Sequence, residues 1–293
     1  RGRAVSDAVE PEAWIVIDLA FGDAGKGTTV DWLVRRRGAR TVVRWNGGAQ
    51  AGHTVVAPDG RRHVFSQFGS GTFVPGVRTF LASDVVVHPT ALLVEARRLS
   101  EIGVPDALDR LAIDGGARVV TPFHQAAGRL RELARGEARH GSCGVGIGET
   151  VRDALGNEPI RMRDLYGGDL RRKAEAVRER LRSSVPRVEV SEELAVLDRR
   201  DIVDAWIDAL APLRARSLLG ECALEGPVIL EGAQGVLLDE RFGFHPHTTW
   251  STCTPGPALE LLRGFRGVVR RLGVLRTYLT RHGEGPFPTE GAL

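Results

Sequence analysis

WIVIDLAFGDAGKGT, residues 14–28, decides the fold class of this 293-residue chain. Its first part, residues 14–20, is a short apolar run rich in β-branched side chains, which is typical of a strand that is buried on both faces. A glycine-rich turn follows at 21–27, and residues 28–36 then carry apolar side chains at helical spacing. A strand, a glycine-rich turn and a helix in immediate succession predict a parallel α/β sheet.

The rest of the chain repeats this alternation. Strands are predicted at 41–45, 79–81, 85–87, 111–114, 227–231 and 274–280, helices at 28–36, 90–102, 122–138, 257–272 and over most of 168–218, and glycine-rich loops at 46–53, 141–148 and 232–235. Residues 1–13 lack periodicity and predict a disordered tail. The predicted fold class is therefore α/β, with a mostly parallel central sheet flanked by helices, P-loop-NTPase-like, with helical insertions, in a single domain over 14–293.

Composition excludes several classes of function. The formal net charge is only +3, which predicts no broad surface for nucleic acid. The three cysteines are odd in number and form no CxxC pair, so neither a disulfide framework nor a zinc cluster is predicted. No apolar run approaches the roughly 18 residues that a membrane span needs, and no signal-peptide core is present. We therefore expect a cytoplasmic protein that binds neither nucleic acid nor a membrane.

The turn at 22–28 has the residue types of a phosphate-binding loop. Glycines allow backbone N–H groups to face phosphate oxygens, and the helix that follows adds a favourable dipole. Lys26 supplies positive charge and Thr28 a hydroxyl. The spacing matches neither Walker A nor GxGxxG, so an ordinary strand–helix turn is the alternative. Phosphate would repel Asp23 unless this carboxylate binds Mg²⁺ or accepts a proton, and helix capping is its alternative role.

Three later segments place polar groups beside glycines or hydroxyls. His53 lies in the second glycine-rich loop, where an imidazole can donate to a phosphoryl oxygen, although a lone histidine is more often structural. Gln234 carries the donor and acceptor groups that can contact the edge of a base. Residues 248–254 (TTWSTCT) are rich in hydroxyls that can bind phosphate. Loop-forming composition is the alternative explanation for the last two segments.

These motifs resemble, in order, four motifs of the adenylosuccinate synthetase family. The family's GDEGKG reads GDAGKG at 22–27, GGxNAGHT reads GGAQAGHT at 47–54, FEGAQGxLLD reads LEGAQGVLLD at 230–239, and YSTRxGxGPFPTE reads YLTRHGEGPFPTE at 278–290. The resemblance implies a GTP-dependent ligase of purine biosynthesis that forms a homodimer. It implies that an NTP, normally GTP, phosphorylates O6 of a purine nucleoside monophosphate, normally IMP. The amine of aspartate then displaces the phosphate.

The resemblance also assigns roles to the matched residues. Asp23 is implied to be the general base and a Mg²⁺ ligand, His53 the acid, and the Gly52 carbonyl a second Mg²⁺ ligand. The residues implied to bind the NTP are Gly22, Asp23, Ala24, Gly25, Lys26, Gly27, Thr28, Gly52, His53 and Thr54. Those implied to bind the other substrate are Gln50, Ala51, Ser142, Cys143, Gln234 and Thr249. Within the second set, Gln234 contacts the base and Thr249 the monophosphate.

The chain departs from the family pattern at several positions. Gln50 stands where the family has Asn, and Cys143 and Val145 stand where its GTTGRG motif has Thr and Arg. Residues 65–71 (FSQFGSG) look more like the short relatives, including phage enzymes that attach aspartate to a guanine nucleotide. Those relatives tend to lose the loop carboxylate that Asp23 retains, and its retention favours activation of O6.

The family's C-terminal third, with its Arg-rich aspartate loop and base-selecting TKxD motif, has no counterpart in the sequence. We expect either a short, diverged branch or a truncated chain, and the NTP base and the amine stay open. Two alternatives therefore remain beside the ligase. One is a homologue of specialised metabolism, or of the phage type, that acts on another nucleotide or amine. The other is a non-catalytic nucleotide-binding protein.

Overall fold

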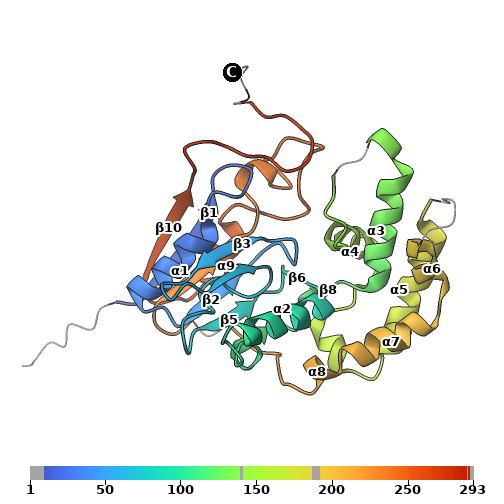
Figure 1. The fold of residues 1–293 in the computed structure, drawn as a ribbon, viewed down its shortest axis with the longest axis horizontal. Helices are drawn as coiled ribbons and strands as arrows, with labels where there is room; N and C mark the ends of the chain where they lie inside the picture. The colour runs from blue at the N-terminus through green and yellow to red at the C-terminus, as the bar shows by residue number, and fades with distance from the viewer. Residues whose placement is uncertain (1–9, 139–140, 187–191, 223, 289, 291–293) are drawn as a thin grey trace, which may run out of the picture.

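A six-stranded parallel sheet forms the centre of the computed structural model, which describes residues 10–138, 141–186, 192–222, 224–288 and 290 (Figure 1). Its strands are β1 (Glu12–Asp18), β2 (Thr41–Arg44), β5 (Arg78–Leu81), β7 (Leu111–Ile113), β9 (Val228–Glu231) and β10 (Val268–Val274). They lie in the order β10-β1-β9-β2-β5-β7, and every pairing is parallel. The predicted mostly parallel sheet is confirmed.

Two small sheets lie beside the central one. β3 (His53–Val56) and β4 (Arg62–Phe65) form an antiparallel hairpin, and β6 (Val86–Val87) pairs in parallel with β8 (Arg118–Val119). The sequence predicts no hairpin, and it places His53 in a loop instead of at the start of β3. Residues of β3 alternate between buried and exposed. They therefore lack the continuous apolar run that identifies the central strands.

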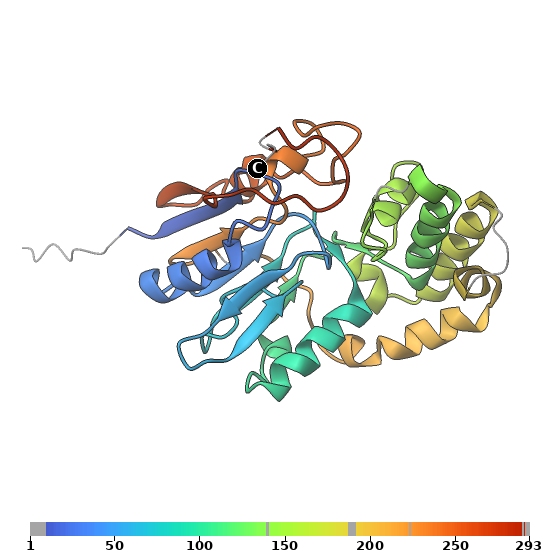
Figure 2. The ribbon, with the colours of Figure 1, turned by 45° about the horizontal axis from the view of Figure 1, so that its top comes forward.

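The described residues form nine α-helices and four short 3₁₀ helices. The α-helices are α1 (Lys26–Arg37), α2 (Pro89–Glu101), α3 (Pro122–Ala134), α4 (Ile147–Ala154), α5 (Leu170–Ser184), α6 (Glu192–Asp198), α7 (Asp201–Ala209), α8 (Ala211–Arg214) and α9 (Gly256–Leu261), and the 3₁₀ helices are η1 (Leu108–Arg110), η2 (Gly136–Ala138), η3 (Met162–Tyr166) and η4 (Val236–Leu238). Helices α3 to α7 gather at one end of the molecule, away from α1 and β10 (Figures 1 and 2). Within the described part of the chain, no helix is both long and apolar enough to cross a bilayer.

Helices cover both faces of the central sheet. Val30 and Leu33 of α1 pack with Val16 of β1 on one face. Ala258 of α9 packs with Ile15 on the other face, because successive side chains of a strand point in opposite directions. With both faces covered, the loops at the carboxyl ends of the parallel strands are where a ligand is expected to bind.

The last part of the chain differs from the prediction. The sequence predicts a helix over 257–272 and a strand over 274–280, whereas α9 ends at Leu261 and β10 spans Val268–Val274. Gly264 takes a left-handed conformation (φ 85°) after the helix. Residues 268–274 then pair along the whole of β1. Local periodicity does not report this pairing with a strand from the other end of the chain.

Three predicted boundaries are also wrong. β1 begins at Glu12, inside the predicted tail, and residues 1–9 of that tail lie outside the described residues. α1 begins at Lys26, two residues before the predicted start. α3 ends at Ala134, and the last three residues of the predicted helix, 136–138, form the 3₁₀ helix η2 instead. Helix ends depend on caps and tertiary contacts that a short sequence window does not show.

Candidate functional site

The loop after β1 is built around a buried carboxylate. Asp18 ends β1 and accepts hydrogen bonds from the backbone N–H groups of Ala20 (2.9 Å), Gly22 (3.2 Å) and Ala24 (2.9 Å). Lys26 Nζ lies 3.3 Å from Asp18 Oδ2. Asp18 is not among the site residues that the sequence predicts. The available signal was a carboxylate at the end of an apolar strand, directly before the glycine-rich turn.

Lys26 faces into the protein. Its side chain is buried, and Nζ donates to the carbonyl oxygen of Gln234 at 2.6 Å. Burial lowers the pKa of Lys26, while the negative charges of Asp18 and Glu231 oppose this effect. Lys26 therefore joins the loop after β1 to the loop after β9. Its contact with a nucleotide phosphate stays a prediction.

Asp23 and Gln234 are the two non-glycine residues with left-handed backbone in the described part of the chain, with φ of 59° and 55°. This conformation is uncommon for such residues and is concentrated at functional sites. Their loops touch, since a Cβ atom on Gly235 would overlap the Ala20 carbonyl oxygen. Two predicted site residues from distant parts of the sequence thus share one junction.

The Asp23 carboxylate is half exposed and does not cap a helix. Gly25 occupies the N-cap position of α1, which has no side-chain cap, so the capping alternative is wrong. Asp23 Oδ2 lies 2.7 Å from His282 Nε2, in the loop after β10. The neighbouring Arg281 guanidinium stacks over the Phe21 ring at 4.7 Å. The predicted motif at 278–290 is therefore brought against the loop after β1.

His53 has a buried acidic partner. Its Nδ1 lies 2.5 Å from Oε1 of Glu231, the last residue of β9. Ser70 donates its backbone N–H to Glu231 Oε2 at 2.9 Å and its hydroxyl to Oε1 at 2.5 Å. Burial alone would raise the pKa of Glu231, but His53, Arg44 and Ser70 outweigh it and lower this pKa to about 2. Glu231 is therefore ionised at neutral pH.

Gly27 brings the loops of Asp23 and His53 into contact. A Cβ atom on Gly27 would lie 2.9 Å from the His53 carbonyl carbon and 3.0 Å from the Thr54 carbonyl oxygen. The Thr28 hydroxyl donates to the same Thr54 oxygen at 3.3 Å. Only glycine leaves room for this approach. The residues predicted to bind the nucleotide, at 22–28 and 52–54, thus lie side by side at the carboxyl end of the sheet.

A cavity of about 340 Å³, the first cavity, is lined by most of the predicted substrate-binding residues. Those that line it are Gln50, Ser142, Cys143, Gln234 and Thr249, whereas Ala51 does not. Gln50 Oε1 and Gln234 Nε2 are buried and have no hydrogen-bond partner among the described residues. Buried polar atoms are normally paired, so these two suit a ligand that offers both a donor and an acceptor.

Arginines and glutamates share the wall of the first cavity. Arg131 and Arg152 both donate to Glu149, at 3.0 and 3.3 Å. The Arg152 side chain is nevertheless 40% exposed. Arg281 reaches the carbonyl oxygens of neighbouring loops instead of a carboxylate. Positively charged groups that remain accessible here suit an anionic ligand such as a phosphate.

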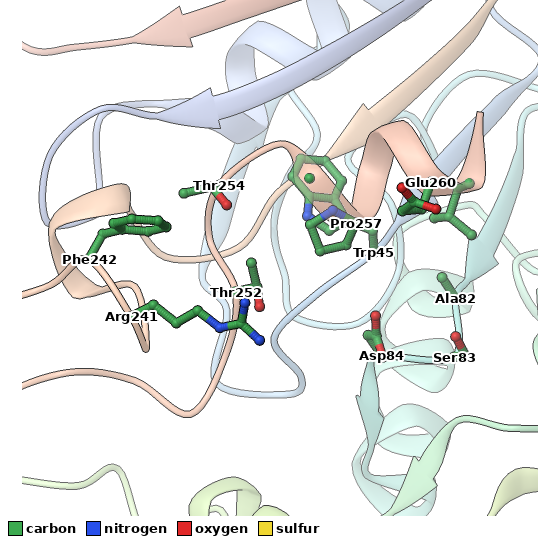
Figure 3. A pocket seen from close by; sticks show the side chains of 12 residues that line it. Trp45, Ala82, Ser83, Asp84, Arg241, Phe242, Thr252, Thr254, Pro257 and Glu260 are labelled. Atoms are coloured by element: carbon green, nitrogen blue, oxygen red, sulfur yellow. The ribbon is translucent and has the colours of Figure 1, made fainter. Parts of the chain in front are cut away.

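A second cavity, of about 470 Å³, lies at the carboxyl ends of β2 and β5, next to α9 (Figure 3). Arg241 stands on one side of it, and Asp84 and Glu260 stand on the other. None of the predicted site residues belongs to its described lining. Thr252 lines this cavity and Thr249 lines the first, so the hydroxyl-rich segment is divided between the two.

The predicted Mg²⁺ ligands fit a metal that arrives with a nucleotide. Asp23 offers an accessible carboxylate, and Gly52 is exposed in the loop next to it. Within the described ranges, no group of three His, Cys, Asp or Glu side chains could hold a metal ion by itself. Mg²⁺ takes oxygen ligands and is commonly bound through one or two carboxylates together with substrate phosphates.

Comparison with known sequences identifies the family. The sequence model of adenylosuccinate synthetase matches residues 15–293. The adenylosuccinate synthetases of Neisseria meningitidis serogroup C and Mycobacterium leprae are 35% and 37% identical to the chain over 281 and 286 residues. These matches cover 94% and 95% of this chain but 64% and 65% of the two relatives. The chain thus spans just under two thirds of their length.

Solved structures share the fold. The fully ligated adenylosuccinate synthetase of Plasmodium falciparum superimposes with a TM-score of 0.73 at 22% identity, over 94% of this chain and 64% of that one. The succinoaminodeoxyadenylate synthetase of cyanophage S-2L, bound to dGMP and dATP, gives 0.57 at 20% identity, over 92% and 65%. Because the family match extends over nearly all of its residues, the chain belongs to the adenylosuccinate synthetase family.

Proposed function

We propose that the chain is a GTP-dependent ligase that joins aspartate to a purine nucleoside monophosphate such as IMP through a 6-phosphoryl intermediate. Its curated relatives carry the name adenylosuccinate synthetase. The observation that carries the proposal is the pair of unpartnered amide atoms, Gln50 Oε1 and Gln234 Nε2, in the first cavity. Gln234 lies three residues after the end of β9, and its carbonyl accepts from Lys26 of the predicted phosphate loop.

The free Gln234 Nε2 donor complements O6 of hypoxanthine, and N1–H is left for the Asp23 carboxylate. An adenine ring carries a donor at N6 instead, which would face the Gln234 donor. The first cavity therefore favours a 6-oxopurine. Thr249 and Ser142 on its wall supply donors for the monophosphate.

In the proposed reaction, Asp23 acts as the base and His53 as the acid. The Asp23 carboxylate takes the N1 proton, which makes O6 a nucleophile for the γ-phosphorus of the NTP, and the NDP leaves. His53 donates a hydrogen bond to the phosphoryl oxygens as their charge develops. The amine of aspartate then attacks C6, and O6 leaves as part of the released phosphate. Bound Mg²⁺, held by Asp23 and the Gly52 carbonyl, would neutralise phosphate charge.

We also propose that the protein forms a homodimer and is cytoplasmic, as the family resemblance implies. Membership of the family supports both. Sedimentation of the purified protein at micromolar concentration tests the dimer. The proposal that the amine is aspartate is supported by the name adenylosuccinate synthetase that the curated relatives carry.

Phosphate release tests the proposed reaction. With GTP, Mg²⁺, IMP and aspartate present, we expect release that falls to background when any one of the four is omitted. Gln234→Met should raise the KM for IMP and leave the KM for GTP unchanged, because the lost amide serves the base. Replacing IMP by a panel of other purine monophosphates, and aspartate by other amines, separates this ligase from a homologue with a different substrate. Nucleotide binding without phosphate release across that panel would overturn the proposal.

A further inference from the structure

Residues 65–71, which depart from the longer family pattern, lie against the candidate acid. Phe65 pairs with His53 in the β3–β4 hairpin. Five residues later, Ser70 donates both its backbone N–H and its hydroxyl to Glu231, which in turn contacts His53. A continuous set of hydrogen bonds thus runs from this segment through Glu231 to the imidazole.

The network is closed to solvent. Ser70 and Glu231 are 0% exposed, and His53 is 7% exposed. A buried carboxylate is tolerated only when its oxygens are hydrogen-bonded and its charge is balanced. Ser70 and His53 supply hydrogen bonds, and the Lys26 and Arg44 charges interact with Glu231. Glu231 is therefore held as an anion that can only accept hydrogen bonds.

An acceptor opposite Nδ1 decides the state of the imidazole. Because ionised Glu231 cannot donate, the proton shared at 2.5 Å belongs to His53 Nδ1. The two ring nitrogens are distinct, and the hydrogen bond at one of them sets the role of the other. Nε2 is then the nitrogen that faces a ligand, and it donates to a phosphoryl oxygen in the protonated ring, where both nitrogens are donors.

We propose that Ser70 and Glu231 are positioning residues that keep the Nδ1 proton of His53 in place and so present Nε2 to the reacting phosphoryl group. The catalytic consequence rests on the role of His53 in the proposed function. Ser70 acts in two ways. Its N–H anchors Glu231 Oε2, and its hydroxyl shares Oε1 with His53.

The two bonds of Ser70 allow a specific test. Ser70→Ala removes the hydroxyl from Oε1, the oxygen that orients His53, and keeps the backbone anchor on Oε2. Ser66→Ala is the matched control in the same segment, since Ser66 contacts Glu95 only through its backbone N–H. Glu231→Gln adds a donor where the anion accepts. Long-range ¹⁵N–¹H NMR of the neutral imidazole reports which nitrogen carries the proton, and steady-state kinetics report kcat and KM.

We expect a single Nδ1–H signal for His53 in the wild type and in Ser66→Ala. Ser70→Ala should show a mixture of tautomers, and Glu231→Gln should lose the preference. In kinetics, kcat should fall on the order of 10- to 100-fold in Glu231→Gln and less in Ser70→Ala, with the KM for GTP unchanged, as for other groups that orient a functional imidazole.

An Nδ1–H signal in Ser70→Ala as pure as in Ser66→Ala, together with equal kcat, would overturn the proposal. Ser70→Ala also decides the matter should Glu231→Gln fail to fold. If the wild type releases no phosphate with any substrate, the proposed function fails. The tautomer comparison then still supports or refutes the positioning of His53 by itself.

Discussion

Asp23 and His53, the two groups expected to move protons, lie in opposite surroundings. The Asp23 side chain is 45% exposed and pairs with His282, whose side chain is 87% exposed. The His53 side chain is 7% exposed and pairs with Glu231, which is fully buried. Left-handed backbone after β1 positions Asp23, whereas a buried hydrogen-bond network positions His53. Substitutions at the open group should therefore affect activity alone, and those in the buried network should also affect stability.

The largest expected effect is at Asp23. Asp23→Asn should reduce phosphate release by roughly 10²- to 10⁴-fold, because it removes the acceptor of the N1 proton. Since the Asp23 side chain is half exposed, the Tm of the variant should differ from that of the wild type by less than about 2 °C. Calorimetry and steady-state kinetics on the same preparation measure both quantities. A large fall in Tm would show that Asp23 supports the fold, as the buried network around His53 is expected to do.

Glu231 should show a pH-dependent contribution to stability. Its pKa is about 2 in the folded protein against an ordinary 4.5. A lowered folded pKa stabilises the protein above the unfolded pKa, by about 3 kcal/mol here, and this stabilisation is lost as the pH falls from about 4.5 to about 2. Urea unfolding of the wild type between pH 7 and pH 3 should therefore be steeper in pH than that of Glu231→Gln. Equal slopes would show that Glu231 is not held as an anion.

Asp153 in α4 provides a buried carboxylate away from the proton chemistry. It lies 2.8 Å from Arg180 and 3.5 Å from His124. Burial would raise its pKa, but these two partners lower it to about 2. Asp153→Asn should cost about 2 kcal/mol of unfolding free energy at pH 7, a cost that disappears as the pH falls from about 4 to about 2. The kcat of Asp153→Asn should stay within twofold of the wild type, unlike the kcat of Glu231→Gln.

The smallest expected effect is at His282. Ion pairs between exposed groups contribute little, so His282→Ala should lower kcat by less than about fivefold and leave Tm unchanged. Kinetics with saturating substrates measure this directly. A loss as large as that of Asp23→Asn would mean that the exposed pair, and not the backbone, positions Asp23.

Local sequence predicted the candidate site residues, but not the buried contacts that position them. Asp23, Gln234 and His53 stand in short motifs that follow strands, and the strands β2 and β9 are continuous apolar runs. Glu231 stands in one of those motifs, but its function depends on Ser70, 161 residues away in the sequence. Asp18 supports a loop through backbone N–H groups, which leave no pattern of side chains. β10 was misplaced for the same reason, since β1 provides its hydrogen-bond partners.

Isotope transfer tests the proposed activation of O6. In this reaction O6 of the purine, bound in the first cavity and activated by Asp23, attacks the NTP and leaves with the phosphate. IMP labelled with ¹⁸O at O6 should therefore transfer one labelled oxygen to each phosphate released in the presence of GTP, Mg²⁺ and aspartate, as measured by mass spectrometry. Phosphate without the label would show that water attacks the NTP instead, and it would rule out the activation of O6.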